Sequence, residues 1–333
     1  MNIAGLWSDL MRRRAEDWVF APLEPNQTPD KMAVDKVVPD AAYVEIFLKS
    51  MRIVDVRRGV KKFFGTVHSF TSLDTLAGKP AQFNVVTTPN QLRNVDASNL
   101  DRVININQRL LGPIPYRGGD LVLETGLFSV VSADLTAPYV DLLQKVSGIA
   151  GVSFLQSALP FVEPIKEGVN LLLGSQGDSM LEVGLATRFT APETRYYVVM
   201  RAPKTSIKTS DLRIDPNDFK VVDIKGTAIT NAPYMVIQVM ARDTRDDWFN
   251  IPELLEHYDL IRDAVRRQNQ NDARAAFEVF QMRARTCNDL ISSHADLLVQ
   301  KVEAQLNTWF PGTKTGAVLG KKFPHFKELG LFQ

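Results

Sequence analysis

Polar and hydrophobic positions alternate over much of the sequence between residues 41 and 247, most regularly in Leu121–Val131. A period of two is typical of strands, because successive side chains of a strand point to opposite faces of a sheet. Similar segments are rich in β-branched and aromatic residues and are separated by Gly and Pro. They predict one long strand or two short ones at 43–48 and 51–56. Further strands are predicted at 60–70, 82–87, 103–110, 181–189, 195–201, 219–224 and 234–240.

Short strands at this spacing favour an antiparallel β-sandwich over a βαβ series with a parallel sheet. One of the predicted strands runs into Pro113 and Pro115. Proline has no amide hydrogen to give to a neighbouring strand, so we expect this strand at a sheet edge or in a turn.

The alternation is interrupted at residues 136–174, where the spacing of apolar positions becomes helical. Within this stretch, Val146–Val162 carries no charged residue, although Ser, Gln and Pro break its apolar character. No part of the chain reaches the roughly 18 uninterrupted apolar residues of a membrane-spanning helix. We therefore predict a helical insertion in the β domain.

After residue 247 apolar positions recur every three or four residues, which is the period of an amphipathic helix. The pattern predicts a three-helix unit at 248–311, with Pro252 opening the first helix and Asn288 and Asp289 capping the last. The predicted fold class is α+β: an antiparallel β-sandwich over 41–247 with a helical insertion, followed by this C-terminal helical unit.

Both ends of the chain have a different pattern. Residues 1–20 have helical spacing and predict an N-terminal amphipathic helix, whereas the prolines of residues 21–40 predict an extended arm. Residues 312–333 form an apolar and basic tail of irregular structure. Segments of this kind often bury apolar surface on a neighbour. The apolar side chains of the tail should dock on this chain or on another, and we expect partner binding through Leu6, Trp7, Leu10, Phe323, Phe326 and Phe332.

The 333-residue chain has a formal net charge of +1, so no overall electrostatic field favours nucleic acid as a partner. Its one cysteine, Cys287, excludes an intrachain disulfide and favours a reducing, cytoplasmic location. We expect Cys287 to be a small core or interface residue. The next histidine, His294, is seven positions away, about two helical turns, which is too far for a nucleophile–base pair.

Motifs of common enzyme classes are missing from the sequence. It contains no Gly-x-Ser-x-Gly elbow, no Gly-Lys-Ser/Thr phosphate loop and no Gly-x-Gly-x-x-Gly fingerprint. A zinc site built on thiolates is excluded by the cysteine count. We therefore expect no catalytic activity and no cofactor, and the sequence identifies no small-molecule substrate.

Three carboxylates, Asp243, Asp246 and Asp247, directly follow a predicted strand. Calcium prefers several oxygen ligands that converge from loops. A β-sandwich with aspartates in such a loop resembles, in outline only, the C2 membrane-binding domains. That resemblance implies a calcium site, although Arg245 interrupts the usual Asp-x-Asp pair. The simpler interpretation is that these aspartates neutralise Arg242 and Arg245.

The leading functional hypothesis is a non-catalytic interaction or structural subunit of a larger protein assembly, which docks through its arm, helical unit and tail. One alternative is a membrane-associated module, either C2-like or of the pore-forming type, in which residues 146–162 would be the active segment. A second alternative is an enzyme of unrecognised type.

Overall fold

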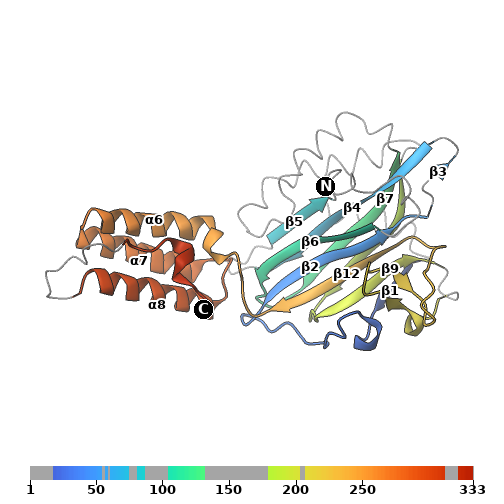
Figure 1. Ribbon diagram of the computed structural model, residues 1–333, viewed down its shortest axis with the longest axis horizontal. Helices are drawn as coiled ribbons and strands as arrows, with labels where there is room; N and C mark the ends of the chain where they lie inside the picture. Colours follow the sequence, from blue (N-terminus) through green and yellow to red (C-terminus); the bar gives the residue numbers. More distant parts are fainter. Residues whose placement is uncertain are drawn as a thin grey trace. The chain divides into compact units, whose positions relative to one another are not determined.

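A computed structural model describes residues 18–54, 57–58, 61–74, 81–86, 104–131, 179–202, 207–311 and 322–332. This part of the chain contains antiparallel sheets and three α-helices, which confirms the predicted α+β class (Figure 1). The chain divides into two compact units. The β unit comprises Met1–Val37, Val44–Pro113 and Gly118–Ala241, and the helical unit comprises Val38–Tyr43, Ile114–Arg117 and Arg242–Gln333.

The described strands form three sheets. The first has the order β1 (Trp18–Pro22), β9 (Arg195–Arg201), β12 (Tyr234–Arg242), β2 (Tyr43–Arg52) and β6 (Ile104–Pro115). The second has the order β3 (Arg57–Arg58), β4 (Lys61–Leu73), β7 (Leu121–Val131) and β8 (Ser179–Phe189), with β5 (Ala81–Val86) also paired to β4. A small third sheet consists of β10 (Arg213–Ile214) and β11 (Val221–Val222).

The first sheet is covered on both faces at its centre. Five consecutive residues of β9 and six of β12 are buried, so these strands are continuous apolar runs rather than alternating ones. One face packs on the β10–β11 hairpin through Tyr196, Val198 and Ile214. The two large sheets meet where Gly65 of β4 faces Met51: a Cβ atom added at Gly65 would lie 3.2 Å from the Met51 side chain. This arrangement is consistent with a sandwich.

The strand that contains Pro113 and Pro115 is β6, and it lies at the edge of the first sheet, as predicted. Its backbone approaches β2 closely at Gly112, which has a φ of 89°. A Cβ atom there would lie 2.2 Å from the carbonyl oxygen of Val44, so only glycine fits this position.

The predicted helix over residues 1–20 is wrong for its last residues, because Trp18–Pro22 is strand β1. Val19 and Ala21 are buried against the sheet core while Phe20 and Pro22 are exposed, which is the period of a strand. Residues 1–17, including Leu6, Trp7 and Leu10, lie outside the described residues.

The proline-rich arm at residues 21–40 is extended, but it lies on its own chain. Leu23 is buried, and its amide donates to the carbonyl of Tyr196 over 2.9 Å. The side-chain amide of Gln27 donates to the carbonyls of Thr209 and Leu212 over 2.9 and 2.7 Å. Residues up to Val37 therefore cover the β unit.

The predicted helical insertion at 136–174 lies outside the described residues, as does Val146–Val162, on which the membrane alternative depends. Within the described ranges, none of the helices combines the length and the apolar character that crossing a bilayer would require.

The helical unit contains α6 (Pro252–Arg266), α7 (Gln270–Thr286) and α8 (Ser292–Trp309), with α7 packed on both other helices (Figure 1). Pro252 opens α6, and the Asn269 side chain caps α7 by accepting from the amide of Asp272 over 3.1 Å. The expected cap of α8 is wrong: the helix begins at Ser292, after Ile291. Short 3₁₀ turns occur at Pro25–Gln27, Thr209–Asp211, Trp248–Asn250 and Phe326–Leu329.

Two buried titratable residues share one face of the second sheet. His68 of β4 pairs with Gly126 of β7, and Phe70 pairs with Glu124, so His68 and Glu124 are diagonal neighbours. Burial lowers the pKa of His68 to about 3 and raises the pKa of Glu124 to about 7. Oε2 of Glu124 has no hydrogen-bond partner among the described residues. The folded chain thus favours the neutral form of both groups.

We predict that Glu124→Gln stabilises the protein increasingly as the pH rises. The pKa of Glu124 is raised from 4.5 to about 7 in the folded state, so the folded state binds its proton more tightly than the unfolded state does. The cost of ionising Glu124 is therefore absent below pH 4.5 and complete above pH 7. The stability difference between variant and wild type should grow over this range to roughly 3 kcal/mol, measured by urea unfolding.

The matched control is Glu278→Gln, because Glu278 is an exposed residue of α7. Its stability difference from wild type should stay flat with pH. A flat difference for Glu124→Gln as well would contradict the buried, unpaired environment of that carboxyl group.

Candidate docking site in the helical unit

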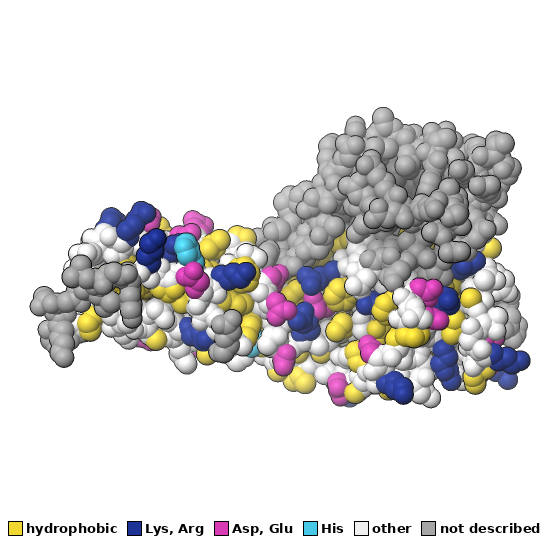
Figure 2. Space-filling view, viewed as in Figure 1, with side chains coloured by type: hydrophobic (Ala, Val, Ile, Leu, Met, Phe, Trp, Pro, Cys, Tyr) yellow, Lys and Arg dark blue, Asp and Glu magenta, His cyan; other side chains and the backbone are white. Residues whose placement is uncertain are grey.

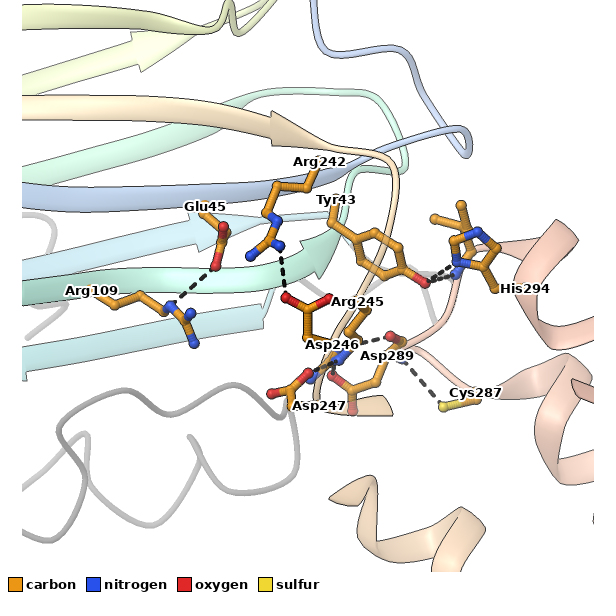
Figure 3. Close-up of polar contacts among 11 residues, drawn as sticks. Tyr43, Glu45, Arg109, Arg242, Arg245, Asp246, Asp247, Cys287, Asp289 and His294 are labelled. Carbon is orange, nitrogen blue, oxygen red and sulfur yellow. Dashed lines mark hydrogen bonds and ion pairs between the residues drawn. The ribbon is translucent and has the colours of Figure 1, made fainter. Parts of the chain in front are cut away.

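The helical unit is built around a fully buried arginine, Arg245, which lies in the segment between β12 and α6 (Figure 3). Its Nε donates to Asp247 over 2.8 Å, and its Nη1 donates to the carbonyl of Asp289 over 2.8 Å. Nη1 also lies 3.3 Å from the Asp289 carboxylate. Two carboxylates thus balance one buried guanidinium, which ties the start of the helical unit to the connection between α7 and α8.

Asp289 therefore has a role that its sequence context did not predict. It was expected to cap α8, but its carboxylate and carbonyl both accept from Arg245. The sequence signal for this contact is weak, because the two residues are 44 positions apart. Only the excess of acidic residues next to Arg245 pointed to local charge pairing.

A second polar cluster holds the segment Val38–Tyr43 against the start of α8. The hydroxyl of Tyr43 accepts from the amide of Ile291 over 3.3 Å and lies 2.9 Å from Nδ1 of His294 (Figure 3). Burial raises the pKa of Tyr43 and lowers that of His294, although Asp243 opposes the latter shift. A protonated hydroxyl can then donate to the free Nδ1 of a neutral imidazole.

The same region contains a hydrogen-bonded ring of charged and polar groups. Ser292 Oγ donates to Asp40 over 2.7 Å, and Arg117 pairs with Asp40 and also donates to the carbonyl of Leu290. The segments Val38–Tyr43 and Ile114–Arg117 are therefore bound to the residues that precede and begin α8. Neither segment showed any sign of this role in the sequence.

Cys287 is buried, as predicted, and its sulfur accepts from the amide of Asp289 over 3.4 Å (Figure 3). Burial raises the pKa of its thiol, and the nearby carboxylates of Asp289 and Glu253 raise it further. The thiol is therefore protonated at neutral pH, in which form it is a poor nucleophile.

Two of the three aspartates proposed as a calcium loop form ion pairs with arginines in the structure. Asp246 pairs with Arg242 over 2.8 Å, and Asp247 pairs with Arg245 over 2.8 Å (Figure 3). Among the described residues, no group of three or more His, Cys, Asp or Glu side chains could hold a metal ion. The calcium hypothesis for Asp243, Asp246 and Asp247 thus finds no set of converging ligands in this part of the chain.

The tail residues expected to bind a partner lie on the helical unit of their own chain. The ring of Phe326 is 4.9 Å from that of Trp248 and 4.7 Å from that of Tyr258. Phe323 lies against Tyr258, and Phe332 lies 4.6 Å from the ring of His294. Phe323 and Phe326 are buried and hold the tail to the helices of their own chain, and their binding to a partner stays a prediction.

Large apolar side chains remain exposed elsewhere on this unit. Leu255 and Leu260 of α6 and Val279 and Met282 of α7 have exposed fractions between 37% and 55%. Val279 and Met282 are three residues apart, so they are neighbours on the surface of α7. We refer to these four residues as the α6–α7 surface.

Comparison of the chain with protein-family models, with curated proteins and with solved structures gives no match.

We predict that the buried and exposed arginine pairs differ strongly in their contribution to stability. Arg245→Met should destabilise the helical unit by about 3–5 kcal/mol, because it leaves the buried Asp289 without its cation. Asp246→Asn breaks an exposed pair and should cost less than about 1 kcal/mol. Denaturant unfolding followed by far-ultraviolet circular dichroism measures both. Equal effects of the two substitutions would contradict the central role of Arg245.

We also predict that calcium at up to millimolar concentration leaves the thermal midpoint unchanged. Asp246 and Asp247 are already held by arginines, and a cation would have to displace both before it could bind. A rise in the midpoint on adding calcium, reversed by a chelator and lost in Asp243→Asn, would instead establish a metal site.

Proposed function

We propose that the protein is a non-catalytic interaction or structural subunit of a larger protein assembly, and that the α6–α7 surface is where a protein partner docks. The observation that carries this proposal is the exposure of Leu255, Leu260, Val279 and Met282. Single exposed apolar residues are common, but a concentration of them on one helical hairpin is typical of a binding surface.

The helices do not need these side chains for their own packing. Their interior is filled by other residues, among them Leu254, Ile261, Phe277, Leu298 and Val302, all buried. Within the described residues, α8 exposes no large apolar side chain, although it is the longest of the three helices. Apolar exposure is thus confined to α6 and α7 within this unit's helices.

The surroundings of the α6–α7 surface favour a protein as the partner. Ion pairs flank the apolar side chains on α6, with Arg262 bound to Asp259 over 2.8 Å and Arg266 bound to Asp263 over 3.0 Å. Figure 2 shows basic, acidic and hydrophobic side chains intermixed over the helical unit. Exposed apolar side chains beside charges of both signs are the composition of protein–protein interfaces, whereas nucleic acid and anionic membranes require a basic patch.

A non-catalytic role agrees with how the reactive side chains are used. Cys287 and Tyr43 are buried with raised pKa values, and His294 shares a hydrogen bond with Tyr43 within the fold. These groups serve the packing of the helical unit, and the sequence supplies no catalytic motif beside them.

The proposal predicts that a double substitution, Leu260→Asp with Met282→Asp, abolishes assembly without unfolding the chain. Each introduced charge would have to be buried unpaired at the interface, which typically costs several kcal/mol. The full-length protein is purified through a tag from its native host, and the mass of the intact species is measured. The wild type should appear in a complex of defined mass and the variant as a free chain with an unchanged thermal midpoint.

The matched control is Ile224→Asp, since Ile224 is 64% exposed on the β unit. This variant should still be recovered in the complex. A wild-type protein that is recovered only as a monomer, or a complex that survives the double substitution, would refute the proposed surface.

A further inference from the structure

Two cations near the end of β2, Lys49 and Arg52, have no counter-charge in the described part of the β unit. Arg52 is only 8% exposed, and its Nε has no hydrogen-bond partner among the described residues. Within the same residues, neither side chain forms an ion pair with a carboxylate. A buried charge is normally paired, because an unpaired one loses its hydration without compensation. This end of β2 therefore carries unbalanced positive charge.

Two other arginines of the first sheet show how the β unit balances such charges. Arg109 of β6 and Arg201 of β9 each pair with a buried glutamate, Glu45 and Glu182, over 3.1 and 3.3 Å. Both arginines are more exposed than Arg52, and yet both have a carboxylate. The guanidinium that needs a counter-charge most is thus the one for which the described residues supply none.

Lys49 is held in place without being neutralised. Its ammonium group donates to Oδ1 of Asn107 over 2.6 Å and lies 4.5 Å from the centre of the Phe219 ring. Burial lowers the pKa of Lys49, whereas Asp30 opposes this shift from a distance. An ammonium group has three donors, so Lys49 retains donors for a further acceptor.

The backbone is strained at both residues that contact this ammonium group. Phe219 lies in the turn between β10 and β11 with a φ of 55°, and Asn107 has a φ of 44°. A bulky residue such as phenylalanine rarely adopts this left-handed conformation. The carbonyl of Phe219 accepts from the hydroxyl of Ser50 over 2.7 Å, which fixes the turn against β2. Strain of this kind is concentrated at ligand-binding sites.

A further donor lies on β12, the neighbour of β2 in the sheet. The hydroxyl of Tyr234 accepts from the amide of Val221 over 3.1 Å, and its own hydrogen has no acceptor among the described residues. Burial raises the pKa of Tyr234 to about 12, so the hydroxyl is protonated and able to donate. The charge of Arg52 opposes this shift, which shows that the guanidinium lies near the hydroxyl.

The carboxylates of this region serve other contacts. Asp218 accepts from the amide of Lys220 over 3.1 Å and pairs with its ammonium group over 3.4 Å. Asp215 lies 3.7 Å from the same ammonium group. Asp30 accepts from the hydroxyl of Tyr196 over 3.2 Å. These carboxylates stabilise the turn and the arm, and the two positive charges at the end of β2 remain unbalanced.

We propose that Lys49, Arg52 and Tyr234 form an anion-binding site whose ligand is the phosphoryl group of a small soluble molecule. Two cations balance the charge of a phosphate monoester, which is close to −2, whereas a carboxylate would balance only one of them. A guanidinium also presents paired N–H donors that match two phosphate oxygens. Because Arg52 is nearly buried, the phosphates of a membrane surface or of a nucleic-acid duplex are too bulky to reach it.

This inference goes beyond the function proposed above, because it concerns a ligand of the β unit and not docking on the α6–α7 surface. The double substitution Leu260→Asp with Met282→Asp should leave phosphate binding unchanged, and a substitution of Arg52 should leave assembly unchanged. Failure of one proposal is therefore distinguishable from failure of the other.

Phosphate binding is measured by titration calorimetry on the full-length protein at about pH 8, where inorganic phosphate is a dianion. Sodium chloride keeps the ionic strength constant, because screening by salt alone changes the interactions of charged groups. Inorganic phosphate should bind saturably, and acetate, a monoanion, should bind at least about tenfold more weakly. Absence of saturable phosphate binding, or equal binding of acetate, would overturn the proposed site.

The variant Arg52→Met removes the guanidinium and keeps an unbranched apolar side chain. It should weaken phosphate binding at least about tenfold, since a charge-assisted contact is lost. In phosphate-free buffer it should also raise the thermal midpoint, because an unpaired buried charge has been removed. Unchanged affinity, or a lower midpoint in that buffer, would show that Arg52 serves the fold and would overturn the proposal.

A second pair of variants tests Lys49 without altering a nearly buried residue. Lys49→Gln removes the positive charge and should weaken phosphate binding at least about fivefold. Arg188→Gln is the matched control, because the Arg188 side chain is 68% exposed and pairs with Asp120, and it should bind phosphate like the wild type. Equal losses in the two variants would reflect net charge alone and would contradict a specific site.

Vesicles test the source of the phosphoryl group. Vesicles of phosphatidylcholine with phosphatidic acid present phosphate monoesters on a membrane surface. The full-length protein should remain in the supernatant when these vesicles are sedimented, although it binds inorganic phosphate. Sedimentation of the wild type with the vesicles, lost in Arg52→Met, would assign the site to a lipid headgroup and would overturn a small soluble ligand.

Discussion

The helical unit has to supply hydrogen-bond acceptors and negative charge to the buried guanidinium of Arg245. A cation without solvent is stable only where carboxylates and carbonyls surround it, and Asp247 and Asp289 provide these groups. Asp289 lies between α7 and α8, so the ion pair fixes the helix connection relative to the segment that enters α6. The neighbouring thiol of Cys287 accepts a hydrogen bond from the amide of Asp289, and this bond orients the same turn.

Both units pair buried polar side chains across distant segments, and in the β unit Glu45 pairs with Arg109 and Glu182 with Arg201. In the helical unit, buried polar side chains are paired across segments that are distant in sequence, as Tyr43 is with His294. In the β unit, Glu124 and His68 are buried on one sheet face and favour their uncharged forms. Pairing fixes the geometry of a unit, because each hydrogen bond needs a correctly placed partner, whereas the neutral forms of Glu124 and His68 avoid the cost of a buried charge.

The fold class and most strands followed from the sequence because hydrophobic periodicity is a local property. Leu121–Val131 is a strand with the predicted bounds. Pro113 lies in an edge strand, as expected for a residue that has no amide hydrogen to donate. The sequence predictions were wrong where contacts with distant parts of the chain determine the structure. Trp18 belongs to a strand because β9 offers a partner, and Asp289 binds Arg245 instead of capping α8. The apolar tail was expected to dock, and Phe323 and Phe326 are buried on their own chain, but a sequence does not specify which surface receives such residues.

The helical unit is assembled from pieces that are far apart in the chain, with Tyr43 and His294 separated by 251 residues and Asp40 and Ser292 by 252. A ribosome that makes the chain from its N-terminus releases Asp40 and Tyr43 long before their partners exist. The unit can therefore close only after His294 has emerged, and closing it requires a loop of 251 residues. During synthesis, the early segments remain exposed to whatever else in the cell can bind them.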